Sequence, residues 1–176
     1  MAEPSGDGPL VERVKIQAEL LVPIVRTLEA ELGVERAHEL VRRALGEHYR
    51  DIAARWVAAR GSLGALDTFV RVSTAGGALD VTNEMPSDSG LSFDVTGCRY
   101  ADFYRAIGEP ELGFLLVCSS DHDLVDGMPG VSLDREQTIM QGAETCTFRY
   151  RFDPRTTVDA AGETDTDSDG GRVRRT

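Results

Sequence analysis

The sequence predicts an α+β fold, in which N-terminal helices precede a mainly antiparallel sheet with interspersed helices and a closing β-hairpin. Two observations lead to this prediction. Up to about residue 60, large apolar residues recur at spacings of three and four, as in amphipathic helices. From about residue 78 to residue 152, short segments alternate apolar and polar residues, as half-buried strands do. A run of helices before a run of strands is typical of α+β domains.

The first helix is predicted to begin near Pro9, because proline is favoured at the first helical position, and to end at Gly33. Pro23 lies inside its apolar pattern and is predicted to kink or split the helix. A second amphipathic helix is predicted from Ala37 to Gly61, and a further helical segment follows it.

Two histidines occur in the second helix. His48 lies on its apolar side, so we expect a packed core histidine there. His38 is predicted to lie at the surface.

Four segments are predicted to be strands. The first two are Ala78–Thr82 and Leu91–Thr96, with a turn-rich connection at Asn83–Gly90. The last two, Val131–Met140 and Thr145–Phe152, are predicted to form an antiparallel hairpin. Cys146, Phe148, Tyr150 and Phe152 would then share one face of the final strand.

Two shorter helices are predicted between these strand pairs. They cover residues 100–107 and 111–119, separated by Gly108 and Pro110. Residues 121–130 are rich in acidic residues with Gly and Pro, and a mobile loop is predicted there.

Length and composition define the domain. The 176 residues suit one domain, which we place at residues 9–153. Residues 1–8 are polar with Pro and Gly, and residues 154–176 are acidic with almost no large apolar side chain. Both segments are therefore predicted to be disordered.

Charge and hydropathy exclude several classes of partner. The net charge of −11 argues against nucleic acid, which requires a basic surface. No run of 18 apolar residues is present, so no membrane span is expected.

The N-terminus lacks the features of a secretory signal, and the three cysteines are an odd number. We therefore expect a cytoplasmic protein with free thiols, and a homo-oligomer is possible because the helices are rich in apolar positions.

Two motifs carry a family resemblance. The segments FDVTGCRYADFYRAIGEPELGFLLVCSSDHD and QTIMQGAETCTFRYRF resemble the L-2-amino-thiazoline-4-carboxylic acid hydrolase family, and the likeness covers roughly residues 10 to 153. The closing strand is also similar, more weakly, to that of the 4-vinyl reductase type of domain. This second resemblance implies only a fold akin to the haem-NO-binding and TRAPP-like group. The positions that match the family pattern are Cys98, Tyr100, Gly108, Pro110, Glu111, Cys118, Asp121, Gly142, Cys146, Phe148 and Arg149.

The resemblance implies a hydrolase that acts on a small cyclic amidine-type carbon–nitrogen bond or a related C–N or C–S substrate. In the family reaction, water opens 2-amino-thiazoline-4-carboxylate to give N-carbamoyl-L-cysteine. The expected partner is thus a small molecule. Two alternatives stay open: a non-catalytic small-ligand-binding or sensor domain, and a cysteine-ligated metal-binding protein.

Cys98 and Cys118 are the candidate nucleophiles. A thiolate attacks an amidine carbon well if a nearby cation or helix N-terminus lowers its pKa. Cys98 lies near a predicted helix start and precedes an arginine, whereas Cys118 is three residues from Asp121. The alternative for each is a buried structural thiol.

A metal site is the second chemical option. Zinc could be held by Cys98, Cys118, Cys146 and either His122 or Asp121. The sequence contains no CxxC pair and no HxxxH pair, so this spacing does not specify a metal. No cofactor is predicted, and zinc remains an option.

The remaining candidates would handle protons and the substrate. Asp121 is the expected general base, because the family motif includes it beside Cys118. Arg149 could bind a substrate carboxylate with both guanidinium nitrogens, and its alternative is a surface charge. Tyr100 and Tyr104 lie one helical turn apart and could line a pocket or pack in the core.

Overall fold

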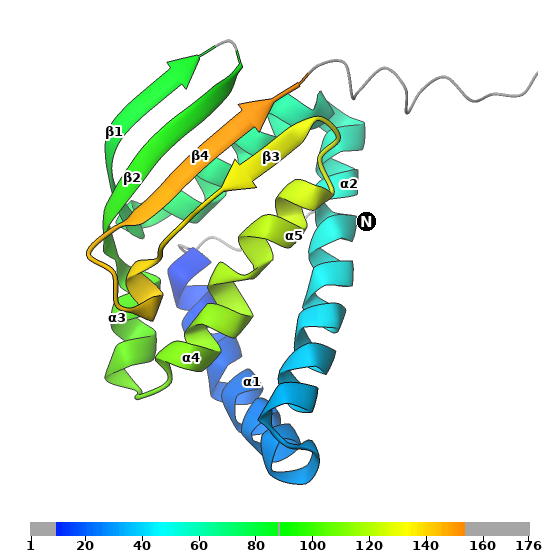
Figure 1. Cartoon of the computed structure of the whole chain (residues 1–176), viewed down its shortest axis with the longest axis vertical. Helices are drawn as coiled ribbons and strands as arrows, with labels where there is room; N and C mark the ends of the chain where they lie inside the picture. The colour runs from blue at the N-terminus through cyan, green and yellow to red at the C-terminus, as the bar shows by residue number, and fades with distance from the viewer. Residues whose placement is uncertain (1–9, 88, 154–176) are drawn as a thin grey trace, which may run out of the picture.

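The computed structural model describes residues 10–87 and 89–153, which form helices on one side of a four-stranded antiparallel sheet (Figure 1). This confirms the predicted α+β class. The segments predicted to be disordered, residues 1–8 and 154–176, lie outside the described residues. Within the described part of the chain, no helix is long and apolar enough to span a membrane.

Two long helices form the N-terminal half. Helix α1 (Leu10–Leu32) joins α2 (Val34–Thr74) through Gly33, whose φ of 81° suits glycine. Gly61 interrupts α2 with φ 71° and ψ 170°, so its last part turns and passes behind the sheet (Figure 1). Of the two outcomes predicted for Pro23, a kink or a split, the split is wrong, because α1 continues through this residue. Pro23 is exposed, so water can bond the carbonyl that proline leaves without a donor.

The sheet contains β1 (Leu79–Ser87), β2 (Gly90–Cys98), β3 (Val131–Asp134) and β4 (Cys146–Phe152), in the order β1-β2-β4-β3. A 3-10 turn, η1 (Ala75–Gly77), leads from α2 into it. Alternate residues of the two central strands point into the core, as the pleat requires. The opposite face of the sheet carries mainly polar side chains. The buried residues on the inner face include Phe93, Val95, Cys146, Phe148 and Tyr150.

Strand β1 is longer than the sequence predicted. The connection predicted at Asn83–Gly90 is wrong in part, because β1 continues to Ser87, which pairs with Gly90 at the start of β2. Asn83 adopts a positive φ of 53° at an irregularity in the strand pairing, and its side-chain amide donates to Asp94 at 2.9 Å. This bond holds the bulge in place. Pro86 is tolerated because β1 is an edge strand.

A chain of short helices connects β2 to β3. Helix α3 (Arg99–Ala106) is followed by α4 (Pro110–Gly113), the π-helical turn η2 (Phe114–Cys118) and α5 (Ser120–Asp126). The mobile loop predicted from Asp121 onward is therefore wrong over its first half. Asp121 and Asp123 lie in the first turn of α5, which follows η2 without a break in the helical backbone.

The β3–β4 pair is antiparallel as predicted, but its first strand is shorter. Residues 135–140 were predicted to extend β3, whereas the strand ends at Asp134. The connection contains the 3-10 turn η3 (Ile139–Gln141), capped by the Thr138 hydroxyl and ended by Gly142 at φ 104°. The strand ends here because the next residue, Arg135, buries its guanidinium among the helices instead of pairing along β4.

Both histidine predictions are wrong. His38 is buried, and its Nε2 lies 2.6 Å from the Glu29 carboxylate, because the start of α2 packs against the end of α1. His48 is exposed, because it lies outside the face of α2 that packs against the rest of the domain.

Candidate functional site

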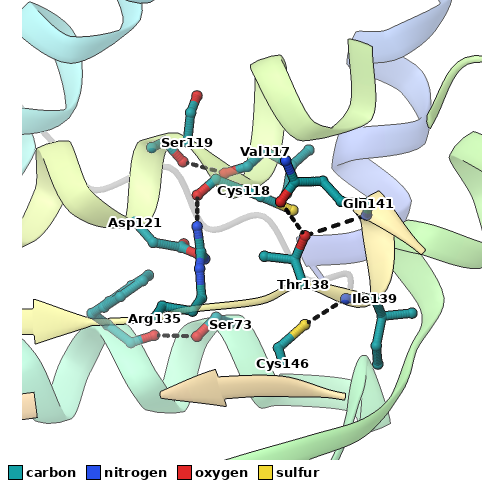
Figure 2. A network of polar contacts seen from close by, with 12 residues as sticks. Ser73, Val117, Cys118, Ser119, Asp121, Arg135, Thr138, Ile139, Gln141 and Cys146 are labelled. Carbon is teal, nitrogen blue, oxygen red and sulfur yellow. Dashed lines mark hydrogen bonds and ion pairs between the residues drawn. The ribbon is translucent and has the colours of Figure 1, made fainter. Parts of the chain in front are cut away.

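Arg135 is the centre of a buried polar network between the sheet and the helices (Figure 2). Its side chain is 3% exposed. One terminal nitrogen donates to an oxygen of the Asp121 carboxylate, and the other donates to the Cys118 carbonyl at 2.7 Å. The guanidinium carbon lies 5.3 Å from the centre of the Phe148 ring, within cation–π range. One cation thus joins α5, the preceding π-helical turn and the central strand β4.

Local structure explains how these groups meet. Arg135 follows β3 directly and continues the inward positions of Val131 and Leu133. On the helical side, the Ser119 amide donates to the Phe114 carbonyl, five residues earlier, at 2.9 Å. Such π-helical turns recur at functional sites, because the additional residue alters which backbone groups face the interior.

Asp121 is the titratable group of this network. Burial raises the pKa of its carboxyl to about 6, although Arg135 opposes the shift. The side chain remains 18% exposed, so water can reach one edge of it. A carboxyl of this pKa changes its charge close to neutral pH and is suited to accepting and returning a proton.

Three tyrosines from different elements lie within electrostatic range of the carboxylate. Burial raises the pKa of Tyr49, Tyr100 and Tyr150, and the charge of Asp121 contributes to each shift. Their hydroxyls therefore stay protonated at neutral pH and can act as hydrogen-bond donors. The Tyr100 hydroxyl donates to the Ser73 carbonyl at 3.3 Å.

The cysteines predicted as nucleophiles are buried thiols. Burial raises the pKa of Cys98, Cys118 and Cys146. Cys98 does precede a helix, as predicted, and its sulfur accepts a hydrogen bond from the Ala101 amide at 3.5 Å. The Cys146 sulfur accepts from the Ile139 amide at 3.1 Å. These thiols are protonated at neutral pH, so the arrangement does not favour thiolate attack.

We expect all three thiols to react slowly in the folded protein. Modification of the native chain with a chromogenic disulfide reagent should release less than one equivalent rapidly, whereas the same reagent in denaturant should label all three cysteines. Burial causes the difference, because reagent access requires local opening. One fast native thiol would contradict this expectation and would return Cys98 or Cys118 to the role of nucleophile.

The residues proposed for zinc do not form a site. Within residues 10–87 and 89–153, no three His, Cys, Asp or Glu side chains lie close enough to hold a metal ion. His122 is exposed on α5, while the three thiols are buried.

The predicted substrate-binding residues lie in different places. Tyr100 and Tyr104 are both buried on α3, and burial raises the pKa of Tyr104 to about 12. Arg149 lies on the opposite face of the sheet, where it donates to Asp94 at 2.7 Å and to the Phe93 carbonyl at 2.8 Å. The structure therefore brings Cys118, Tyr100 and Asp121 into one region and leaves Arg149 outside it.

Sequence reasoning missed Arg135 and Tyr49. The signal for Arg135 was present, since it continues the inward, otherwise apolar positions of β3, and a charge at such a position requires a buried partner. Tyr49 carries no comparable signal, because an aromatic residue on an amphipathic helix is most often part of the core.

The fold and the network define an α+β domain with a buried carboxylate that titrates near neutral pH. The chain belongs to the L-2-amino-thiazoline-4-carboxylic acid hydrolase family, whose model matches residues 13–150. No curated protein matches the chain. The fold resembles the crystal structure of the phenol-responsive sensory domain of the transcription activator PoxR with phenol, at 14% identity, 80% coverage of this chain, 78% of that chain and a TM-score of 0.46. This similarity is too low to support a functional argument.

Proposed function

We propose that this chain is a hydrolase that opens a small cyclic amidine, with 2-amino-thiazoline-4-carboxylate as the expected substrate. Membership of the family supplies the substrate class. The observation that carries the proposal is the Asp121 carboxylate, which Arg135 holds in place and whose pKa is about 6. The three cysteines are unpaired, which supports action in the cytoplasm.

In the proposed reaction, Asp121 accepts a proton from water as the water oxygen bonds to the amidine carbon, and returns that proton to the ring nitrogen. The carbon–sulfur bond then breaks as the new hydroxyl becomes a carbonyl, and the hydroxyl proton ends on the sulfur. The product is N-carbamoyl-L-cysteine. Arg135 acts as a positioning residue, because its two terminal nitrogens already bind Asp121 and the Cys118 carbonyl.

The test is turnover as a function of pH, with N-carbamoyl-L-cysteine measured by mass spectrometry. Only ionised Asp121 accepts a proton, so kcat/KM should rise through an apparent pKa near 6 and level off above it. A profile without an inflection between pH 5 and 7 would contradict the assignment of Asp121 as the base.

A non-catalytic small-ligand-binding or sensor domain is the second candidate. The burial of all three thiols and of Arg135 favours it, because few reactive groups then face solvent. This candidate predicts that the thiazoline carboxylate protects the protein against thermal unfolding. It also predicts no product at any pH.

A further inference from the structure

The outward face of α1 carries a stripe of three large aliphatic side chains. Ile16, Leu20 and Ile24 follow one another at intervals of four residues and are 64%, 68% and 53% exposed. This α1 stripe lies opposite the face that packs into the core, where Val11 and Val25 are buried. Each of the three side chains would be stabilised by removal from water, on the order of 1–2 kcal/mol each.

An unpaired charge stands at each end of the α1 stripe. Arg13 precedes it and Glu31 follows it, and both lie close to the line of Leu20 on the helix surface. Both are exposed, and neither forms an ion pair within the part of the chain that the structure describes. Other charges on the same helix are paired, for example Lys15 with Glu12 at 2.7 Å and Arg26 with Glu29 at 2.6 Å.

We propose that a second copy of this chain covers the α1 stripe, with the two helices antiparallel and a two-fold axis near residue 22. Leu20 then faces Ile24 of the partner subunit, and Ile24 faces Leu20 of the partner subunit. The same axis places Arg13 opposite Glu31 of the partner subunit, and it does so at both ends. A two-fold interface must be self-complementary, and this helix face satisfies that condition in both apolar contact and charge.

Charge selects the antiparallel arrangement. A parallel pair would place Arg13 against Arg13 of the partner subunit and Glu31 against Glu31 of the partner subunit. The α1 helix of 23 residues is about 35 Å long and about 10 Å wide. This face is at the small end of specific interfaces, so we expect a reversible dimer with a dissociation constant on the order of micromolar. The proposal is independent of the proposed enzymatic function.

Sedimentation velocity of the full chain over a micromolar concentration range tests the dimer. The mass should rise from 19.1 kDa toward twice that value. Leu20→Glu should weaken association at least about tenfold, because it places a carboxylate in the apolar contact. Met85→Glu is the matched control, since Met85 is 64% exposed, close to the 68% of Leu20, but lies on β1. A monomer at every concentration, or a dimer that Leu20→Glu leaves unchanged, would overturn the proposal.

A charge exchange tests the orientation. Arg13→Glu and Glu31→Arg should each weaken the dimer, because each places like charges opposite one another. The double variant should restore association, since every pair is again of opposite sign. In a parallel dimer every one of these changes leaves like charges opposite one another, so neither single change would weaken association and the double variant would restore nothing; that result would overturn the antiparallel arrangement.

Discussion

Replacement of Asp121 by Asn should lower kcat/KM for the thiazoline carboxylate by a factor of about 10²–10⁴, the usual contribution of a positioned general base. The amide keeps the shape of the side chain and can still accept a hydrogen bond from Arg135, but it does not take a proton from water. Steady-state turnover above pH 7 measures the loss, because wild-type Asp121 is ionised there.

Two variants separate this effect from general damage. Asp123 lies two residues farther along the same helix and pairs with Arg50 at 2.8 Å. The Asp123→Asn variant should therefore retain activity within about twofold of the wild type. Cys118→Ala removes the sulfur but keeps the backbone carbonyl that Arg135 binds, so activity should also persist. Full activity of Asp121→Asn would refute the base, and loss of activity only in Cys118→Ala would indicate covalent catalysis. Circular dichroism should show that each variant is folded.

Asp121 also links pH to stability in a direction opposite to that of most carboxyls. Its folded pKa of about 6 exceeds the unfolded value of about 3.9, so the folded state binds the proton more tightly. This contribution is therefore present in full below about pH 4 and is lost as pH rises through about 6. Glu29 has the opposite shift, since Arg26 and His38 lower the pKa of its buried carboxyl against the effect of burial.

Hydrophobic periodicity predicted the fold class, but it did not predict strand ends or side-chain burial that depend on long-range contacts. The spacing along α1 and α2 determines which faces are apolar, whereas the end of β3 depends on a long-range contact of Arg135 with α5. His38 and His48 illustrate the same limit. Both lie on one amphipathic helix, but α1 covers His38, whereas α5 packs against α2 at Gly46 and leaves His48 exposed.

The candidate site was predicted in part, because Asp121 and Cys118 belong to one sequence motif and lie together in space. The role of Cys118 could not be read from its neighbours. A cation near a thiol lowers its pKa, but burial raises the pKa of Cys118 more, and burial is a property of the fold. Arg149 matches the family motif and is predicted to bind a substrate carboxylate, but alternation along β4 directs it to the other face.

Replacement of Arg135 by Met should destabilise the protein by about 3–5 kcal/mol at pH 7, because it leaves the Asp121 charge buried without its partner. The Cys118 carbonyl also loses its donor from Arg135. Methionine retains most of the apolar stem that packs near Phe148, so the loss arises mainly from charge and hydrogen bonding. Urea unfolding, extrapolated linearly to water, measures the change.

Arg149→Met is the matched control. Arg149 also binds a carboxylate and a main-chain carbonyl, but its side chain is 37% exposed, so the expected cost is only about 0–1 kcal/mol. The cost of Arg135→Met should be smaller at pH 5, because Asp121 is then largely neutral and needs no cation. Adding Asp121→Leu should recover much of the lost stability at pH 7, since both charges leave the interior together. Equal losses of unfolding free energy in the two arginine variants at both pH values would contradict this prediction. The Arg135–Asp121 pair would then contribute no more to stability than an exposed ion pair.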